Sequence, residues 1–508
     1  MFPIVGIGAS AGGLDAFRQL LGALTSDTGI AYVLVQHLDP RHDSILAELL
    51  SETTRMEVSE VKGDVRVEAD RIYVTPPSQD IVFAEGMLRL VPRPQTGGAH
   101  MPIDVFLRSL AAAQGSRSIG VILSGMGSDG TLGLEAIKGE GGITLAQDPR
   151  SARNEDMPRS AIAAGCVDFV LPPEGIAREL TRLGRHPYVA DAAEAPASSA
   201  EEATDGMTRI LARLLQATGA DFSAYKKTTL ERRIARRMAV SRMETLEDYA
   251  RYLEGDAAET EALYRDCLIS VTSFFRDGGV FEALAAQVLP ALLDDRPADA
   301  PIRVWVPGCA SGEEAYSIAI CLLEAAGKRP SNPTFQIFGT DLSDSALKKA
   351  RAGLYLENIA QHVSPERLQR FFSKVDGSYQ ISKAIREMCV FARHDLTRDP
   401  PFSRMDLISC RNVLIYLEAR LQERVFSTFH YALSPSGFLV LGPAESAGAT
   451  SPLFSALDEK HRIYAKKAVA NAPHLHFAPR TAVERPTTET PFTPRAAATS
   501  ARADTKAL

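Results

Sequence analysis

The stretch Arg303-Val304-Trp305-Val306-Pro307-Gly308-Cys309-Ala310-Ser311-Gly312-Glu313-Glu314-Ala315-Tyr316-Ser317 decides the fold of the second half of the chain. An apolar run ends at Pro307, a turn holds Gly308 and Gly312, and a helical pattern follows. In doubly wound α/β sheets this order brings backbone close to a nucleotide-like ligand. A second apolar run ends in Asp341, whose carboxylate can accept hydrogen bonds from both hydroxyls of a ribose. Turn and acid together predict a site for a ribose-bearing cofactor.

The composition is that of a multidomain globular protein. The chain has 508 residues, which is enough for about three domains of ~150 residues each. A net charge of −7 argues against a nucleic-acid binder by bulk charge. The six scattered cysteines favour reduced thiols in the cytoplasm over a disulfide framework or a zinc site. No window holds ~18 uninterrupted apolar residues, so we expect no transmembrane helix.

Strand and helix patterns alternate through residues 1–186 and predict a doubly wound parallel sheet. Ser10 follows the first predicted strand, His37 ends the second, and Asp129 follows a later one. The turns at the carboxyl ends of parallel strands converge on one crevice, where a serine, a base and a carboxylate would form a hydrolytic triad. Two alternatives stay open, a dinucleotide loop at Gly6-Ile7-Gly8 and a helix-capping role for Asp129.

Four blocks in this half occur over residues 1–184. They are Ile7-Gly8-Ala9-Ser10-Ala11-Gly12-Gly13, Val35-Gln36-His37, Leu123-Ser124-Gly125-Met126-Gly127-Ser128-Asp129-Gly130, and Gln147-Asp148 with Met157-Pro158-Arg159. In residues and in order they resemble the catalytic domain of the chemotaxis protein-glutamate methylesterase, CheB. The resemblance implies catalytic roles for Ser10, His37 and Asp129 and an oxyanion hole formed by the backbone N–H groups of His37 and Met126. It further implies hydrolysis of protein glutamate methyl esters, and deamidation of glutamine by the same site.

Residues 187–206 are polar and of low complexity, which predicts a linker. A helical pattern follows over residues 207–295. Within it, residues 226–238 carry six basic side chains against one acidic one, and keep an apolar face at four-residue spacing. A solvated helix face is one interpretation and nucleic-acid binding is another, although no aromatic residues are interleaved for stacking on bases.

The pattern after Asp341 is that of a Rossmann-like methyltransferase domain over residues 296–468, with an insertion at about 352–390. A reductase would need a tighter three-glycine fingerprint than Gly308 and Gly312 provide. Residues 469–508 are rich in Pro, Ala, Thr and Arg and predict a disordered tail.

Four further motifs lie in this half of the chain. They are Val271-Thr272-Ser273-Phe274-Phe275-Arg276, Gly312-Glu313-Glu314-Ala315-Tyr316-Ser317-Ile318-Ala319, Gly339-Thr340-Asp341 and Cys410-Arg411-Asn412-Val413-Leu414-Ile415-Tyr416. They closely resemble the chemotaxis receptor methyltransferase CheR over about residues 207–467. The resemblance implies S-adenosylmethionine as cofactor and glutamate side chains on helical receptor segments as substrate.

The same resemblance assigns residues to both ligands. The implied cofactor contacts are Ser270, Thr272, Arg276, Glu313, Asp341, Asp395, Leu396, Asn412 and Val413. Of these, Ser270 and Asp395 stand where the enterobacterial-type pattern has Asn, which they can replace as hydrogen-bonding groups. The implied contacts to an acidic receptor helix are Lys226, Lys227, Arg232, Arg233, Arg236 and Arg237. The insertion is implied to be a small antiparallel β subdomain.

These expectations combine into an α/β protein with an esterase domain (1–186), a linker (187–206), a helical subdomain (207–295) and a cofactor-binding domain (296–468). The expected function is a bifunctional cytoplasmic signalling enzyme that adds and removes glutamate methyl esters. The expected partner is a glutamate-rich helical segment of a chemoreceptor, without nucleic acid and without membrane insertion. The alternatives are a pseudoenzyme scaffold and a nucleic-acid-binding protein, and the latter would bind duplex DNA in a strongly salt-dependent way.

Overall fold

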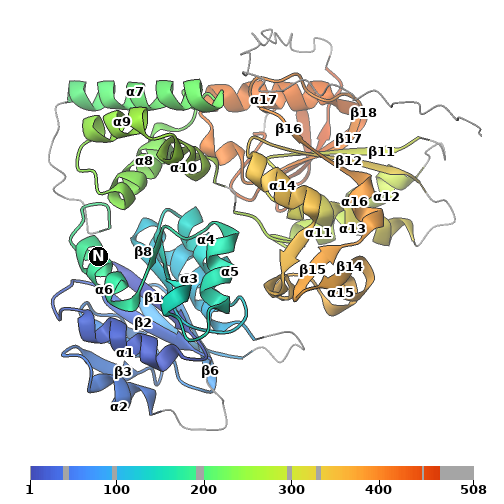
Figure 1. Cartoon of the computed structure of the whole chain (residues 1–508). Coiled ribbons are helices and arrows are strands. Elements are labelled where there is room, and N and C mark those ends of the chain that lie inside the picture. Colours follow the sequence, from blue (N-terminus) through green and yellow to red (C-terminus); the bar gives the residue numbers. More distant parts are fainter. Residues whose placement is uncertain are drawn as a thin grey trace, which may run out of the picture.

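The computed structural model describes residues 2–37, 45–93, 100–189, 200–269, 271–294, 300–327, 333–448 and 451–469. An α/β half, a helical bundle and a second α/β half follow one another along the chain. In Figure 1 the first half is blue to teal, the bundle is green, and the second half runs from yellow to red. The predicted tail beyond residue 469, and residues 190–199 of the predicted linker, lie outside the described residues.

The first half is built on a seven-stranded parallel sheet with the order β10-β9-β8-β1-β2-β5-β3. The strands are β1 (Ile4–Ala9), β2 (Ala31–Gln36), β3 (Glu57–Glu60), β5 (Arg71–Val74), β8 (Ser118–Ile122), β9 (Ile143–Gln147) and β10 (Phe169–Leu171). The helices are α1 (Gly13–Ala23), α2 (Leu46–Ser51), α3 (Pro102–Gln114), α4 (Thr131–Gly139), α5 (Asp156–Ala164) and α6 (Pro173–Gly184). This confirms the predicted doubly wound sheet.

The near-continuous apolar runs of this half become strands because both faces of the sheet are covered. All six residues of β1 are buried. One core lies under α1 and α6, and a second lies under α3, α4 and α5 on the other face. The predicted hairpin is present as antiparallel β6 (Gln79–Ala84) and β7 (Met87–Pro92), and β7 also pairs with the short β4 (Val65–Arg66).

The bundle contains α7 (Ala200–Thr218), α8 (Lys227–Ser241), α9 (Leu246–Gly255) and α10 (Ala257–Leu268), packed around a core of its own. Helix α7 begins inside the predicted linker. At the other end of the linker, Val189 is buried in the core of the first half, and Tyr188 donates a hydrogen bond to the Gly141 carbonyl at 2.6 Å. The free connection between the two parts is therefore shorter than the predicted 187–206.

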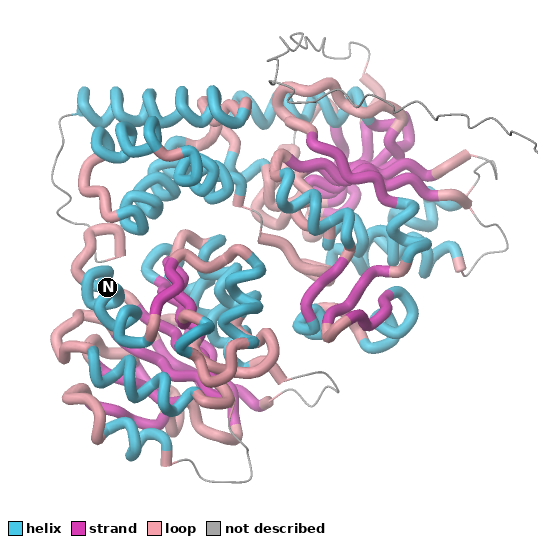
Figure 2. Tube along the Cα trace, viewed as in Figure 1, coloured by secondary structure: helices cyan, strands magenta, loops and turns pink. Residues whose placement is uncertain are grey.

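The second half is built on a mixed sheet with the order β16-β12-β11-β17-β18-β20-β19. Its strands are the magenta segments at the upper right of Figure 2. The strands are β11 (Ile302–Pro307), β12 (Phe335–Asp341), β16 (Cys389–Arg393), β17 (Met405–Cys410), β18 (Leu433–Leu441), β19 (Phe454–Asp458) and β20 (Ile463–Lys466). The helices include α11 (Gly279–Ala283), α12 (Leu289–Leu293), α13 (Glu313–Ala326), α14 (Asp344–Ala352), α15 (Pro365–Phe371), α16 (Lys383–Met388) and α17 (Ala419–Ala432). Only β20 runs against the other strands, since it pairs antiparallel with both β18 and β19, and β19 was not predicted.

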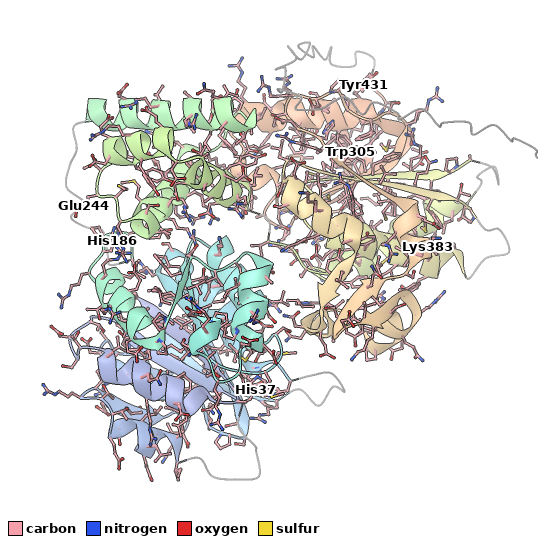
Figure 3. The ribbon with its side chains drawn as sticks, viewed as in Figure 1. His37, His186, Glu244, Trp305, Lys383 and Tyr431 are labelled. Carbon is pink, nitrogen blue, oxygen red and sulfur yellow. The ribbon has the colours of Figure 1, made fainter. Side chains whose placement is uncertain are left out.

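The predicted insertion is a small antiparallel sheet formed by β13 (Leu354–Leu356), β14 (Phe372–Val375) and β15 (Ser378–Ile381). Trp305 of β11, labelled in Figure 3, is fully buried in this half. It donates its indole N–H to the Thr340 hydroxyl of the neighbouring β12 at 3.0 Å. None of the helices in the described part of the chain is long and apolar enough to cross a lipid bilayer.

Candidate active sites

The first candidate site lies at the carboxyl ends of β1 and β2. Ser10 directly follows β1, and its backbone N–H donates to the Ser124 carbonyl at 3.0 Å, which ties the serine turn to the turn after β8. The two turns pack closely, because a Cβ on Gly125 would lie only 3.0 Å from the Cβ of Ser10. The Gly12 that follows has a φ of 76°, a left-handed conformation that glycine adopts without strain. The glycines thus hold Ser10 at the rim of the crevice.

The predicted acid and base of this site are paired. Nε2 of His37 lies 2.7 Å from a carboxylate oxygen of Asp129. Asp129 is 2% exposed and also accepts backbone hydrogen bonds from Ile103 and Asp104 at 2.9 Å each. These donors come from the first turn of α3, whereas the side chain of Asp129 does not cap α4, so the capping alternative is wrong. Because Asp129 engages Nε2, Nδ1 is the His37 nitrogen that can accept a proton.

The predicted contact between Ser10 and His37 and the predicted oxyanion hole are not formed in the same way. Among the described residues no hydrogen bond joins the Ser10 hydroxyl to the His37 ring, as is common in sites without substrate. The His37 backbone N–H, predicted for the oxyanion hole, donates to the Ala9 carbonyl at 3.4 Å, so this amide already has a partner. Met126 is exposed, and no described residue accepts a hydrogen bond from its backbone N–H. Its oxyanion role stays a prediction.

A buried carboxyl that the sequence analysis missed lies behind this site. Asp104 is fully buried and accepts hydrogen bonds from the Gly133 backbone at 2.7 Å and from the side chain of Asn358 at 3.1 Å. Burial, and then the nearby Asp129, raise the pKa of Asp104 well above its ordinary value. Asn358 belongs to the second half of the chain, so the esterase site is supported from both halves.

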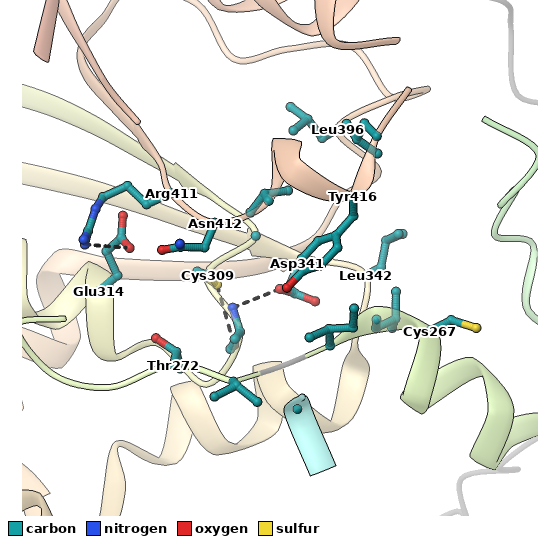
Figure 4. Close-up of a pocket in the computed structure, with 18 of the residues that line it drawn as sticks. Cys267, Thr272, Cys309, Glu314, Asp341, Leu342, Leu396, Arg411, Asn412 and Tyr416 are labelled. Atoms are coloured by element: carbon teal, nitrogen blue, oxygen red, sulfur yellow. Dashed lines mark hydrogen bonds and ion pairs between the residues drawn. The ribbon is translucent and has the colours of Figure 1, made fainter. Parts of the chain in front are cut away.

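The second candidate site is a pocket of about 130 Å³ at the carboxyl ends of β11, β12 and β17 (Figure 4). The strand–turn–helix predicted from the sequence forms its wall, with Gly312 at a φ of 94° before α13. Seven of the nine predicted cofactor residues line the pocket: Thr272, Arg276, Asp341, Asp395, Leu396, Asn412 and Val413. Ser270 lies outside the described residues, and Glu313 lines a neighbouring cavity instead.

Asp341 is positioned by backbone rather than by side chains. Its two carboxylate oxygens accept hydrogen bonds from Ala310 at 2.9 Å and from Ser343 at 2.8 Å. Burial raises the pKa of Asp341, while these backbone donors act in the opposite direction. The glycine turn and the acid predicted to act together are therefore physically linked.

The loop that carries Asn412 is held by an acid that the sequence analysis did not single out. Glu445 is 4% exposed and accepts backbone hydrogen bonds from Asn412, Val413, Leu414, Ile415 and Gly442 at 2.7–3.3 Å. This fixes the side chain of Asn412 at the pocket, where its Oδ1 atom is buried without a partner among the described residues. A buried acceptor of this kind fits a ligand that brings an N–H or O–H donor.

Of the two adjacent acids at the start of α13, only Glu313 was predicted to contact the cofactor, and the structure places its neighbour at the pocket. Glu314, not Glu313, lines the pocket, and it accepts a hydrogen bond from Ser409 at 2.6 Å. Glu313 accepts from the Ser311 hydroxyl at 2.8 Å, and burial raises the pKa of Glu313 to about 7. A strand–turn–helix pattern does not determine which of two consecutive side chains faces the turn, so the sequence could not separate them.

The basic helix differs most from its prediction. Of its six basic side chains, Lys226, Lys227 and Arg232 are exposed, whereas Arg233, Arg236 and Arg237 are at most 8% exposed. Arg236 pairs with Asp266 of α10 and with Asp168 of the first half, and donates to the Gly142 carbonyl at 2.9 Å. Arg237 pairs with Glu259 inside the bundle, where the Nε–Oε1 distance is 2.9 Å.

Arg233 completes the contact between the bundle and the first half. Its guanidinium donates to the carbonyls of Lys138 and Gly139 at the end of α4. The expectation that all six basic side chains contact a partner is therefore wrong for Arg233, Arg236 and Arg237. Burying a guanidinium is costly unless it is paired, and the acids that pair with Arg236 and Arg237 belong to this chain. A partner-binding role for Lys226, Lys227 and Arg232 stays a prediction.

Comparison with known families assigns each part of the chain. The CheB methylesterase family model matches residues 5–180. The all-alpha domain of CheR methyltransferase matches residues 205–268, and the SAM binding domain of CheR methyltransferase matches residues 270–463. S-adenosylmethionine is therefore the cofactor of the second site, and the unpartnered Asn412 acceptor and the Asp341 carboxylate fit its donors.

Individual relatives match the chain over different shares of its length. The chain is 39% identical over 438 residues to an uncharacterized 104.1 kDa protein of Rhodobacter capsulatus, a match covering 82% of this chain and 46% of that protein. It is 34% identical to a chemotaxis protein methyltransferase of Listeria monocytogenes, covering 47% of this chain and 87% of that protein. The solved catalytic domain of Thermotoga maritima CheB methylesterase is 30% identical, covering 36% of this chain and 99% of that one, with a TM-score of 0.34. The chain belongs to the chemotaxis protein methyltransferase family and carries a CheB methylesterase domain ahead of its two CheR domains.

Proposed function

We propose that this chain both forms and hydrolyses methyl esters on glutamate side chains of chemoreceptors. The observation that carries the proposal is that two separate sites occur in one polypeptide. One joins His37 to Asp129 beside Ser10, and the other gathers Asp341 and Asn412 around a cofactor pocket. Ser10 does not line that pocket, so each reaction has its own machinery.

The esterase reaction uses the residues at the ends of β1 and β2. Nδ1 of His37 takes the proton of the Ser10 hydroxyl as the oxygen attacks the ester carbonyl. Asp129 stabilises the imidazolium that forms, since its oxygen lies 2.7 Å from Nε2. The protonated ring then gives its proton to the departing methoxide, so methanol leaves, and water hydrolyses the acyl-serine by the same route.

The transfer reaction uses the residues around the pocket. S-adenosylmethionine, when bound, supplies a methyl group that a carboxylate can attack directly. Asp341 is placed to accept hydrogen bonds from ribose hydroxyls, and Asn412 offers its free Oδ1 to a donor of the ligand. The protein contributes mainly by holding the glutamate carboxylate in line with the methyl–sulfur bond of the cofactor.

A glutamate-rich helical segment of a receptor is the proposed substrate. Lys226, Lys227 and Arg232 are exposed at the start of α8, where they would attract carboxylates flanking the target. We place the protein in the reducing cytoplasm, which suits six cysteines that are all free and buried. The scaffold alternative gains no support, because the His37–Asp129 pair is formed. The nucleic-acid-binding alternative also gains no support, because three of the six basic side chains on the basic helix are buried.

Replacing Asp341 with alanine should weaken S-adenosylmethionine binding by roughly 1.5–3 kcal/mol, the range for hydrogen bonds to a charged group. Titration calorimetry on the full-length protein would measure it. Asp344→Ala is the matched control, because Asp344 is an exposed acid three residues away that does not line the pocket. Equal affinity for the Asp341→Ala variant and the control would place the ribose contact elsewhere.

A further inference from the structure

Helix α4 of the esterase half ends at the cofactor pocket of the methyltransferase half. Gly139 and Glu140 line that pocket together with Thr272, Arg276 and Tyr416. In Figure 4 the end of α4 is the cyan segment below the pocket side chains. The pocket that holds the methyl donor is therefore bordered by a glutamate from the other half of the same chain.

The contact is too close to accommodate side chains other than that of Glu140. A Cβ on Gly139 would lie 2.2 Å from the Cγ2 atom of Val271, which precedes Thr272. Gly141 has a φ of 91°, and a Cβ there would lie 3.2 Å from the Tyr188 hydroxyl. In the loop Gly139-Glu140-Gly141-Gly142 the glutamate carries the only side chain. Gly139 lets this loop approach Val271, and the carboxylate of Glu140 projects from the loop beside the pocket.

The loop is held in place by buried arginines of the bundle. Arg233 donates to the carbonyls of Lys138 and Gly139, and Arg236 donates to the carbonyl of Gly142 at 2.9 Å. Arg236 is fully buried and paired with Asp168 of the esterase half. These bonds bracket Glu140 on both sides, so its backbone position is fixed relative to the methyltransferase half.

The side chain of Glu140 is exposed and lines a pocket that also holds Arg276 and Arg411. Burial raises the pKa of Tyr416, which lies at the pocket. Arg233 and Arg276 lower this pKa and Glu140 raises it, so the charge of Glu140 acts on the same phenol as these two guanidinium groups. In the part of the chain that the structure describes, the Glu140 carboxylate has no salt-bridge partner. A carboxylate near guanidinium groups but not locked in an ion pair is free to turn toward the methyl donor.

We propose that Glu140 is a methyl acceptor of this chain, presented to its own methyltransferase site by the docked esterase half. An oxygen of the Glu140 carboxylate forms a bond to the methyl carbon as the carbon–sulfur bond of S-adenosylmethionine breaks. The electron pair of that bond goes to sulfur, so the products are S-adenosylhomocysteine and the neutral Glu140 methyl ester. The inference rests on the proposed methyl transfer to glutamate and names a substrate for that site.

The test uses the full chain with Ser10→Ala, so that the esterase cannot remove the product, and S-adenosylmethionine with a deuterated methyl group. Tryptic cleavage after Lys138 and Arg150 gives the peptide of residues 139–150, in which Glu140 is the only glutamate. Fragment masses should place the label on Glu140, and Glu140→Gln should reduce the label in this peptide to background. The matched control Glu155→Gln, at an exposed glutamate of the same half, should leave it unchanged.

The kinetics test the presentation within one chain. Labelling within a chain is first order, so tenfold dilution should leave the labelled fraction at a given time unchanged. A labelled fraction that falls with dilution would show transfer between molecules and would overturn the proposal. So would an unlabelled 139–150 peptide in a protein that methylates receptor glutamates. Failure of transfer to both Glu140 and receptor would instead count against the proposed methyltransferase function itself.

Discussion

Replacing Ser10 with alanine is expected to abolish methanol release from glutamate methyl esters and to leave methyl transfer intact. Ser10 is the hydroxyl that the turn after β1 places at the crevice of the His37–Asp129 pair. Removing a catalytic nucleophile typically lowers the rate by ~10⁴–10⁶. Methanol release from a methylated receptor segment and transfer of labelled methyl groups would be measured on the same preparation.

A matched control separates this effect from damage to the fold. Ser51→Ala changes an exposed serine at the end of α2, whose hydroxyl donates only to the Glu48 carbonyl among the described residues, and should leave both activities unchanged. Methanol release at the wild-type rate in pure Ser10→Ala protein would show that another group performs the hydrolysis. Loss of both activities would show that the two sites are not independent.

Replacing Arg236 with alanine is expected to destabilise the docking of the esterase half on the bundle. The Arg236 side chain is fully buried between Asp168 and Asp266, whose side chains are at most 3% exposed. Removing one partner of a buried ion pair typically costs ~3–5 kcal/mol, because it leaves buried charge uncompensated. Denaturant unfolding, with small-angle scattering to detect separation of the halves, would measure the loss.

Two further variants make the Arg236 prediction specific. Lys227→Ala, on the same helix, removes an exposed side chain that only faces Glu231 at 3.5 Å, so stability should change by less than ~0.5 kcal/mol. A double-mutant cycle of Arg236→Ala with Asp168→Ala should give a coupling above ~1 kcal/mol. A coupling near zero would show that the two halves do not hold each other through this pair.

The strand ends were predictable because parallel sheets impose a simple rule on sequence. Apolar runs that end in a glycine turn or a lone polar residue identified Ser10, His37, Asp129 and Asp341. The structure places Ser10, His37 and Asp341 at strand ends and Asp129 in the turn between β8 and α4. The rule works because the carboxyl ends of parallel strands are where backbone and side chains are free to meet a ligand.

The basic helix could not be predicted in the same way. Its apolar face is visible in the sequence, but the acids that allow Arg236 to be buried lie 30 and 68 residues away, one of them in the other half. A run of charges is expected to be solvated unless such partners are known, and spacing along one helix does not reveal them. The same limit hid Glu445, which contacts the Asn412 loop across 33 residues.

The central claim is that one chain adds and removes glutamate methyl esters, and mass spectrometry of a candidate receptor segment tests it most directly. The segment would be incubated with labelled S-adenosylmethionine and the Ser10→Ala protein, then with wild-type protein. The label should accumulate as esters on glutamate side chains in the first step and leave as methanol in the second. Label on any other residue type, or an ester that wild-type protein does not remove, would contradict it.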